Sequence, residues 1–252
     1  MRLTTHCFAV TGLAYFTPWC VNAGFIAGEE ATLIVDAGAN TLAAQTIHGY
    51  ASTARPGNKL MLVNTEKHFD HICGNGFFRG IGVEIWGHAK LARTPAEFEA
   101  EIAGTNAAIP DPVRRARKEA NAFFYDTRLT FPDHAVEAGQ TFSLGEVAAE
   151  ILLTPGHTQT NLSVWVPQEG VLYTGDCVVR EYLPNLDAGT PVDWQIWLAT
   201  IDKIAALRPE FLVPGHGPVA RGTEILAALD SMRSVLREAI DRGFSPTSPD
   251  HR

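Results

Sequence analysis

Four apolar segments of this 252-residue chain run directly into short motifs rich in side chains that ligate metals. The segments Lys59–Val63, Ile151–Leu153, Val171–Tyr173 and Phe211–Leu212 have the composition of short buried strands. A chain in which each such strand ends at a ligand-type residue is expected to gather those residues at one edge of its sheets. The candidate ligands are Glu66, His68, Asp70, His71, His157, Asp176 and His216.

The densest motif lies between Glu66 and His71, directly after the first apolar segment. Glu66, His68 and Asp70 alternate with other residues, so an extended chain would point all three to one side. His71 follows at once and is expected to swing back as the chain turns. Imidazole and carboxylate ligands suit zinc, iron, manganese or nickel better than a metal that prefers thiolate.

The tripeptide Pro-Gly-His occurs twice, ending at His157 and at His216. Glycine allows a close approach of the backbone, and proline fixes the entry to the turn. Taken singly, each tripeptide is typical of a turn with an incidental histidine. Because both follow a predicted strand, and the motif at Glu66–His71 does so too, the combination indicates a metal site.

Predicted strands and helices fall into two successive batches, each of which mixes antiparallel strands with helices. This pattern predicts two stacked sheets with helices outside, in two halves of one domain over residues 1–252. The other predicted strands are Cys7–Val10, Leu13–Phe16, Cys20–Ala27, Ala31–Val35, Ala148–Leu153 and Leu162–Val166, and the predicted helices are Ala39–Ser52, Trp194–Leu207 and Glu224–Ile240.

Two segments depart from this pattern. Residues 95–125 are helical in composition and charged, which predicts a helical insertion between the halves that helps to wall the pocket together with the loop Arg180–Pro191. Residues 244–252 are predicted to be a disordered tail. The apolar stripe of the helix Glu224–Ile240 is compatible with a homodimer, although packing on the chain's own sheet explains it equally well.

Composition limits the partners and the compartment. The net charge of −8 provides no basic face, so neither nucleic acid nor an anionic membrane is an expected partner. The four cysteines show no paired spacing, which predicts free thiols in a reducing compartment. Apolar runs fall short of the roughly 20 residues that span a bilayer, and we expect a cytoplasmic protein that acts on a small molecule.

These motifs resemble those of the metallo-β-lactamase superfamily. The resemblance rests on Val35-Asp36-Ala37-Gly38, on the run Glu66–His71, on both Pro-Gly-His tripeptides and on Gly175-Asp176. It implies an α/β fold, a four-layer αββα sandwich of two mixed sheets with helices on both outer faces. It also implies two divalent ions, zinc first with iron or manganese as alternatives. One would be held by Glu66, His68 and His157, the other by Asp70, His71 and His216, with Asp176 bridging both.

One position departs from the family pattern, because Glu66 stands where the usual HxHxDH run begins with histidine. Glutamate still ligates through oxygen. Glu66, Asp70, Asp176 and a bridging hydroxide would neutralise two divalent ions, whereas a histidine would leave the site one unit positive. The change is therefore expected to favour harder ions such as iron or manganese.

The resemblance implies a hydrolase in which a metal-bridging hydroxide attacks the substrate. Asp70 is the expected catalytic carboxylate, because a ligand carboxylate keeps a second oxygen free to orient the nucleophile and to pass its proton to the leaving group. Having Asp176 at the bridging position is similar to the thioesterases and lactonases of the family. The expected substrate is a small ester, lactone or thioester.

Two alternatives remain open at this stage. The first is an oxidoreductase on the same fold, an oxygenase or persulfide dioxygenase with a single iron, which the additional carboxylate of Glu66 favours. The second is a non-enzymatic metal-binding protein in which Glu66 has abolished catalysis. Iron at one ion per chain with consumption of O2 would indicate the first, and metal binding without turnover would indicate the second.

Overall fold

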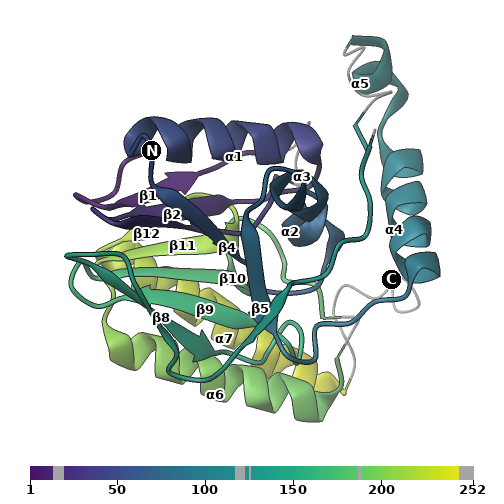
Figure 1. The fold of residues 1–252 in the computed structure, drawn as a ribbon. Coiled ribbons are helices and arrows are strands. Elements are labelled where there is room, and N and C mark those ends of the chain that lie inside the picture. Colours follow the sequence, from purple (N-terminus) through teal and green to yellow (C-terminus); the bar gives the residue numbers. More distant parts are fainter. Residues whose placement is uncertain (14–19, 117–122, 125, 187–188, 244–252) are drawn as a thin grey trace.

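The structure is a computed structural model, and it describes residues 1–252 apart from 14–19, 117–122, 125, 187–188 and 244–252. Two mixed six-stranded sheets are stacked face to face between two layers of helices (Figure 1). The predicted αββα sandwich is thus confirmed. Among the described residues, no helix is long and apolar enough to cross a membrane.

The first sheet has the strand order β1-β2-β3-β4-β5-β6 and comes from the first half of the chain. Strands β1 to β3 form an antiparallel meander, and β3 to β6 are parallel. Every residue of β3 is buried, as expected for a strand covered on both faces. The strands are β1 (Cys7–Val10), β2 (Ala23–Ala27), β3 (Ala31–Val35), β4 (Lys59–Val63), β5 (Glu84–His88) and β6 (His134–Val136).

The second sheet has the order β12-β11-β10-β9-β8-β7, and only its β10–β11 pair is parallel among the described strands. The register between β10 and β11 shifts at Gly175, so the strand pairing becomes irregular where the ligand-type residues begin. The strands are β7 (Thr141–Ser143), β8 (Ala148–Leu153), β9 (Leu162–Val166), β10 (Val171–Val179), β11 (Phe211–His216) and β12 (Ala220–Arg221).

Helices cover both outer faces, α1 over the first sheet and α6 with α7 over the second (Figure 1). Several begin at strong caps: Asn40 caps α1, and capping boxes start α4 at Thr94 and α6 at Thr190. The helices are α1 (Thr41–Ala54), α2 (Phe69–Ile72), α3 (Asn75–Gly80), α4 (Pro95–Ala108), α5 (Asp111–Ala116), α6 (Pro191–Leu207) and α7 (Thr223–Arg242).

The central core lies between the two sheets and draws on both halves of the chain, for example Ile26 and Leu33 from the first and Val164 and Tyr173 from the second. We propose on this ground that residues 1–252 form one domain. The apolar stripe of α7 packs into the chain's own second sheet and α6. That stripe therefore gives no argument for a homodimer, which stays a prediction.

Some expected boundaries were wrong. The run Glu66–His71 is not extended throughout, because helix α2 begins at Phe69 and carries the last two ligand-type residues. Asp176 lies within β10, which continues to Val179 instead of ending at Tyr173. The insertion is helical in α4 and α5, whereas the predicted strand Leu13–Phe16, the end of the insertion and the predicted disordered tail fall wholly or partly outside the described residues.

Candidate metal centre

The seven predicted ligands converge at one edge of the sandwich, although they come from both sheets. Glu66 and His68 lie in the loop after β4, and His157 lies in the loop after β8. Their ligand atoms, with those of the other four residues, form groups in which all atoms lie within 4.8 Å of one another. The groups are Glu66, His68 and His157; Asp70, His71 and His216; and Glu66, His71 and Asp176.

Glycines in the two Pro-Gly-His turns make this convergence possible. A methyl group on Gly215 would overlap the carboxylate of Asp176, and one on Gly156 would overlap the indole of Trp197. That indole is itself fixed, since its Nε1 donates to the carbonyl of Cys177 at 2.8 Å. The expected close approach to the site is thus seen at Gly215, whereas Gly156 approaches Trp197, whose ring lies beside that of His157.

The first group is centred on the buried carboxylate of Glu66. Its Oε1 lies 2.9 Å from Nδ1 of His68 and its Oε2 lies 3.8 Å from Nε2 of His157. The two imidazoles approach each other at 2.9 Å between His157 Nε2 and His68 Nδ1. Although Oε2 of Glu66 is fully buried, it has no hydrogen-bond partner. A buried carboxylate oxygen without a partner, beside two imidazole nitrogens, is the arrangement that a bound cation would satisfy.

In the second group, His216 lies between two carboxylates. Its Nε2 is 3.2 Å from Oδ2 of Asp70 and 3.2 Å from Oδ2 of Asp176. On the other side, Nε2 of His71 lies 3.2 Å from Oδ1 of Asp176 and 3.4 Å from Oε1 of Glu66. Asp176 also faces His157 at 3.6 Å. Its carboxylate therefore lies between the two groups, as a bridging ligand would.

Outer hydrogen bonds turn three of the imidazoles inward. His157 and His216 each place Nδ1 3.1 Å from a backbone carbonyl, those of Asn185 and Cys20 respectively. His71 places Nδ1 2.9 Å from Oδ2 of Asp36. In each case Nε2 is left to face the centre. Such partners on the far nitrogen are characteristic of metal-binding histidines, whose tautomer and ring orientation they fix.

Asp36 belongs to the site although it was predicted only as a family signpost after an early strand. It is buried and has a left-handed backbone, with φ of 66°. Besides His71, its carboxylate accepts hydrogen bonds from the backbone N–H and the hydroxyl of Thr65, both at 2.7 Å. It therefore connects the end of β3 to the loop that carries Glu66. An acidic residue directly after the mostly apolar strand β3 was the available signal.

The electrostatics of the cluster favour a cation. Burial by itself would raise the pKa of Asp176, but the imidazoles of His216 and His71 hold it well below its usual range. The pKa values of the imidazoles shift in the opposite direction. Burial alone would lower the pKa of His68, but the neighbouring carboxylate of Glu66 raises it to about 9. The carboxylates thus stabilise positive charge at their centre. Imidazole and carboxylate donors in this arrangement fit divalent metal ions.

A cavity of about 250 Å³ opens onto the cluster. No lysine or arginine lines it among the described residues. Tyr182, from the predicted loop, is part of its wall. Trp194 instead belongs to α6 and is buried in the core between that helix, the second sheet and α7, and Phe123, near the end of the predicted insertion, packs on Val21 and Ala39. Beyond the ligand-type residues, the lining consists of Phe69, Glu101, Thr105, Val179, Tyr182, Leu183 and Asn185. Cys73 and Cys177 are buried and free, as the sequence analysis predicted of the thiols.

Comparisons with known proteins agree with this geometry. The model of a family described as the metallo-beta-lactamase superfamily matches residues 17–216. A hydroxyacylglutathione hydrolase of Rhodobacter capsulatus is 31% identical over 116 residues, which are 46% of this chain and 44% of that protein. A metallo-beta-lactamase type 2 of Bacteroides fragilis is 31% identical over 121 residues, 47% of each chain. The matches thus span less than half the length of these curated relatives.

Solved structures show the same fold at lower identity. A metallo-beta-lactamase family protein of Thermus thermophilus superposes with a TM-score of 0.69 at 18% identity, covering 96% of this chain and 82% of that one. A metallo-beta-lactamase of Pontibacter korlensis gives a TM-score of 0.65 at 18% identity, covering 92% of this chain and 97% of that one.

Proposed function

Because the chain belongs to the metallo-beta-lactamase superfamily, we propose that it is a metal-dependent hydrolase with a binuclear centre. Glu66, His68 and His157 would hold one ion, and Asp70, His71 and His216 the other. Asp176 would contact both. The observation that carries this proposal is the buried oxygen of Glu66, which lacks a partner at the point where the imidazoles and carboxylates converge.

Two divalent ions, when bound, would lower the pKa of a water molecule and polarise the carbonyl of the substrate. The chain's own residues supply the rest. Asp70 lines the cavity, and its Oδ2 lies 3.2 Å from Nε2 of His216 on the side of the proposed metal ion, which leaves Oδ1 to orient the attacking water and to carry a proton to the leaving group. Asp36 and the carbonyls of Asn185 and Cys20 hold three imidazoles in the tautomer that directs Nε2 inward.

The cavity suits a small and uncharged ester, lactone or thioester. Phe69, Tyr182 and Leu183 provide apolar wall, and the lack of a lysine or arginine in the described lining removes the usual partner of an anionic substrate. Glu66 adds a negative charge to those of Asp70 and Asp176, so the ligand residues would leave two divalent ions with less net positive charge than a histidine at this position would. The thioester hydrolase among the relatives supports this substrate class. We propose zinc as the first candidate metal. Manganese and iron are the alternatives, because oxygen ligands suit these harder ions.

The test begins with metal analysis by mass spectrometry on protein purified without chelator or added metal. Two ions of zinc or manganese per chain support the binuclear centre, and hydrolysis is then screened on esters, lactones and thioesters. Asp70→Asn is expected to abolish hydrolysis, whereas Asp133→Asn, at a partly exposed carboxylate that pairs with Arg79, is the control that retains it.

Three outcomes would overturn parts of this proposal. Turnover of phosphodiesters alone would contradict the substrate class. One iron per chain with consumption of O2 and no hydrolysis would favour the oxygenase, in which Glu66 or His71 does not ligate as proposed. Bound metal without turnover on any ester would indicate a metal-binding protein, and recovery of activity in Glu66→His would identify Glu66 as the cause.

A further inference from the structure

Helix α4 lies beside the sandwich, outside both helical layers, and α5 extends beyond it (Figure 1). Among the described residues of the two helices, Phe98 is the one buried side chain. It packs with Phe69, Ile72 and Cys73, which belong to or adjoin α2. Apolar contacts of this kind are not directional, so they hold α4 near the body without fixing its rotation or its position along its axis.

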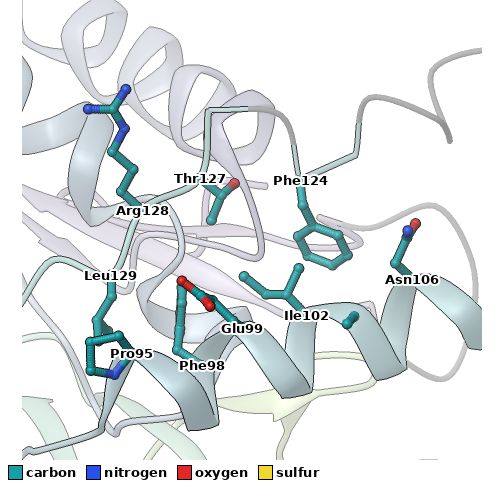
Figure 2. A pocket seen from close by; sticks show the side chains of 10 residues that line it. Pro95, Phe98, Glu99, Ile102, Asn106, Phe124, Thr127, Arg128 and Leu129 are labelled. Carbon is teal, nitrogen blue, oxygen red and sulfur yellow. The ribbon is translucent and has the colours of Figure 1, made fainter.

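Two cavities lie on different sides of α4. Glu101 and Thr105 line the cavity of the metal centre. One residue further along, and so about 100° around the helix, Ile102 and Asn106 line a second cavity of about 520 Å³, with Phe124 on its opposite side (Figure 2). Figure 2 shows Ile102 and Phe124 pointing toward each other across this space. Phe98 lines the second cavity too, and α4 is therefore the wall that the two cavities share.

The wall between the two cavities continues from α4 to the loop after β4 that carries Glu66 and His68, which we call the ligand loop. Phe69 lines the metal-centre cavity, and its ring meets that of Phe124 edge-on with centroids 5.9 Å apart. The apolar surface of the second cavity thus begins directly behind Phe69. A small displacement of α4 away from Phe69 would join the two spaces.

Arg93 makes three contacts that determine where α4 lies. Its guanidinium forms an ion pair with Glu101, donates from Nη1 to the backbone carbonyl of Lys67 at 3.3 Å, and lies 5.9 Å from the ring centroid of Phe98. The Arg93 side chain is 10% exposed. Lys67 stands between Glu66 and His68, so a single buried cation links α4 to the loop of the proposed ligands. Such charge-assisted contacts are directional and fix a geometry that apolar packing leaves free.

We propose that Arg93 is a positioning residue that holds α4 against the ligand loop and thereby keeps the two cavities apart. With Arg93 in place, Glu101 and Thr105 remain in the wall of the metal-centre cavity, and substrates are limited to small acyl groups. Without it, α4 moves outward and the apolar space lined by Ile102 and Phe124 becomes accessible from the metal centre. The part that concerns substrate size rests on the proposed hydrolase function.

Hydrogen exchange tests the positioning role without any activity. Arg93→Met retains much of the side chain's apolar length and removes its charge. We expect the backbone amides of residues 98–105 to exchange about 10- to 100-fold faster in this variant, because it loses a charged hydrogen bond that is largely shielded from water. Arg93→Lys should restore part of the protection, because it keeps the charge. Arg233→Met is the matched control, since the Arg233 side chain is 18% exposed, pairs with Asp202 and Asp230, and lines neither cavity.

Unchanged exchange in α4 of Arg93→Met would overturn the proposal, and so would an equal increase in α1 and α6, which would report general destabilisation. Selectivity is then measured as the ratio of kcat/KM for decanoyl and acetyl esters. We expect Arg93→Met to raise this ratio by about tenfold or more, mainly through KM of the long substrate, with Arg233→Met unchanged. An unaltered ratio would contradict the role in substrate size. If the wild-type chain hydrolyses no ester, the proposed function fails while the exchange experiment still decides the role of Arg93.

Discussion

Replacing Asp36 by alanine is expected to destabilise the metal-free protein by about 3–5 kcal/mol. The carboxylate accepts three hydrogen bonds, from the backbone N–H of Thr65, from its hydroxyl and from the ring of His71. All three donors are buried. A buried donor that loses its acceptor costs roughly 1–3 kcal/mol, and breaking a buried charged pair costs roughly 3–5 kcal/mol. Because the three donors share one acceptor, their separate penalties do not add, and the cost of one broken buried charged pair, about 3–5 kcal/mol, applies.

The backbone of Asp36 calls for a second variant. At φ of 66° alanine is strained by about 1 kcal/mol relative to glycine. Asp36→Gly removes the same carboxylate without that strain. It should therefore be more stable than Asp36→Ala by about 1 kcal/mol. Because aspartate and alanine share the strained backbone, the deficit of Asp36→Ala relative to wild type is the one that reports the three hydrogen bonds.

The same substitutions should weaken metal binding by about 10- to 100-fold, because His71 loses the partner that directs its Nε2 toward Asp176. Urea unfolding in chelator at pH 7 measures the stability, and competition with a chromophoric chelator measures the metal Kd. A loss of stability under 1 kcal/mol would refute the reasoning about the hydrogen bonds. A large loss of stability with an unchanged Kd would refute the claim that Asp36 acts through His71.

Three further predictions concern other parts of the structure. Glu66→His is expected to lower the ratio of manganese to zinc that the protein binds from a medium containing both, because it exchanges an oxygen ligand for imidazole. An equal ratio in the variant and the wild type would contradict the role of Glu66 as a metal ligand. At Glu169, burial would raise the pKa of the carboxyl group, but hydrogen bonds led by that of Thr4 lower this pKa below its usual value. The ionised Glu169 therefore stabilises the fold above the pKa of about 4.3 that glutamate has in the unfolded chain. This stabilisation is lost as the pH falls through the lower pKa of the folded state. Chelated wild-type protein should accordingly be more stable to urea than Glu169→Gln at pH 7, with a gap that narrows below pH of about 4; a gap independent of pH would contradict this. Gly215→Ala should retain the far-ultraviolet circular dichroism of the fold and lose more than half of the bound metal, because the added methyl displaces Asp176; full metal occupancy would show that the close approach is unnecessary.

The ligand-type residues could be predicted from the sequence because their information is local. Each motif combines a buried strand, a turn residue and a donor side chain within a few positions, as in Pro214-Gly215-His216. The sandwich followed from the same strands together with the family resemblance. Helices α1, α6 and α7 were predicted within three residues of their observed ends, since their apolar periodicity and their caps agree.

Features that depend on distant contacts escaped prediction. Nothing adjacent to Asp36 indicates that it accepts hydrogen bonds from Thr65 and His71, which lie 29 and 35 positions away. Alternation of side chains suggested an extended run through Asp70, but the turn into α2 begins at Phe69, where the ring packs on Phe98 and Phe124. Tertiary packing decides such local conformations, and a local sequence pattern does not show the distant residue with which each contact is made.

The position of the centre explains why the chain needs both of its sheets to build it. Glu66 and His71 follow β4 of the first sheet, whereas Asp176 and His216 belong to β10 and β11 of the second. A further link crosses the same edge, because Asn22 donates to the carbonyl of Pro214 at 2.9 Å. The mutually facing donors therefore exist only when the two sheets are packed together. Cations that bind the packed state and not the unfolded chain must stabilise that packing by mass action, so the stability of the sandwich should rise with the concentration of free metal above its Kd.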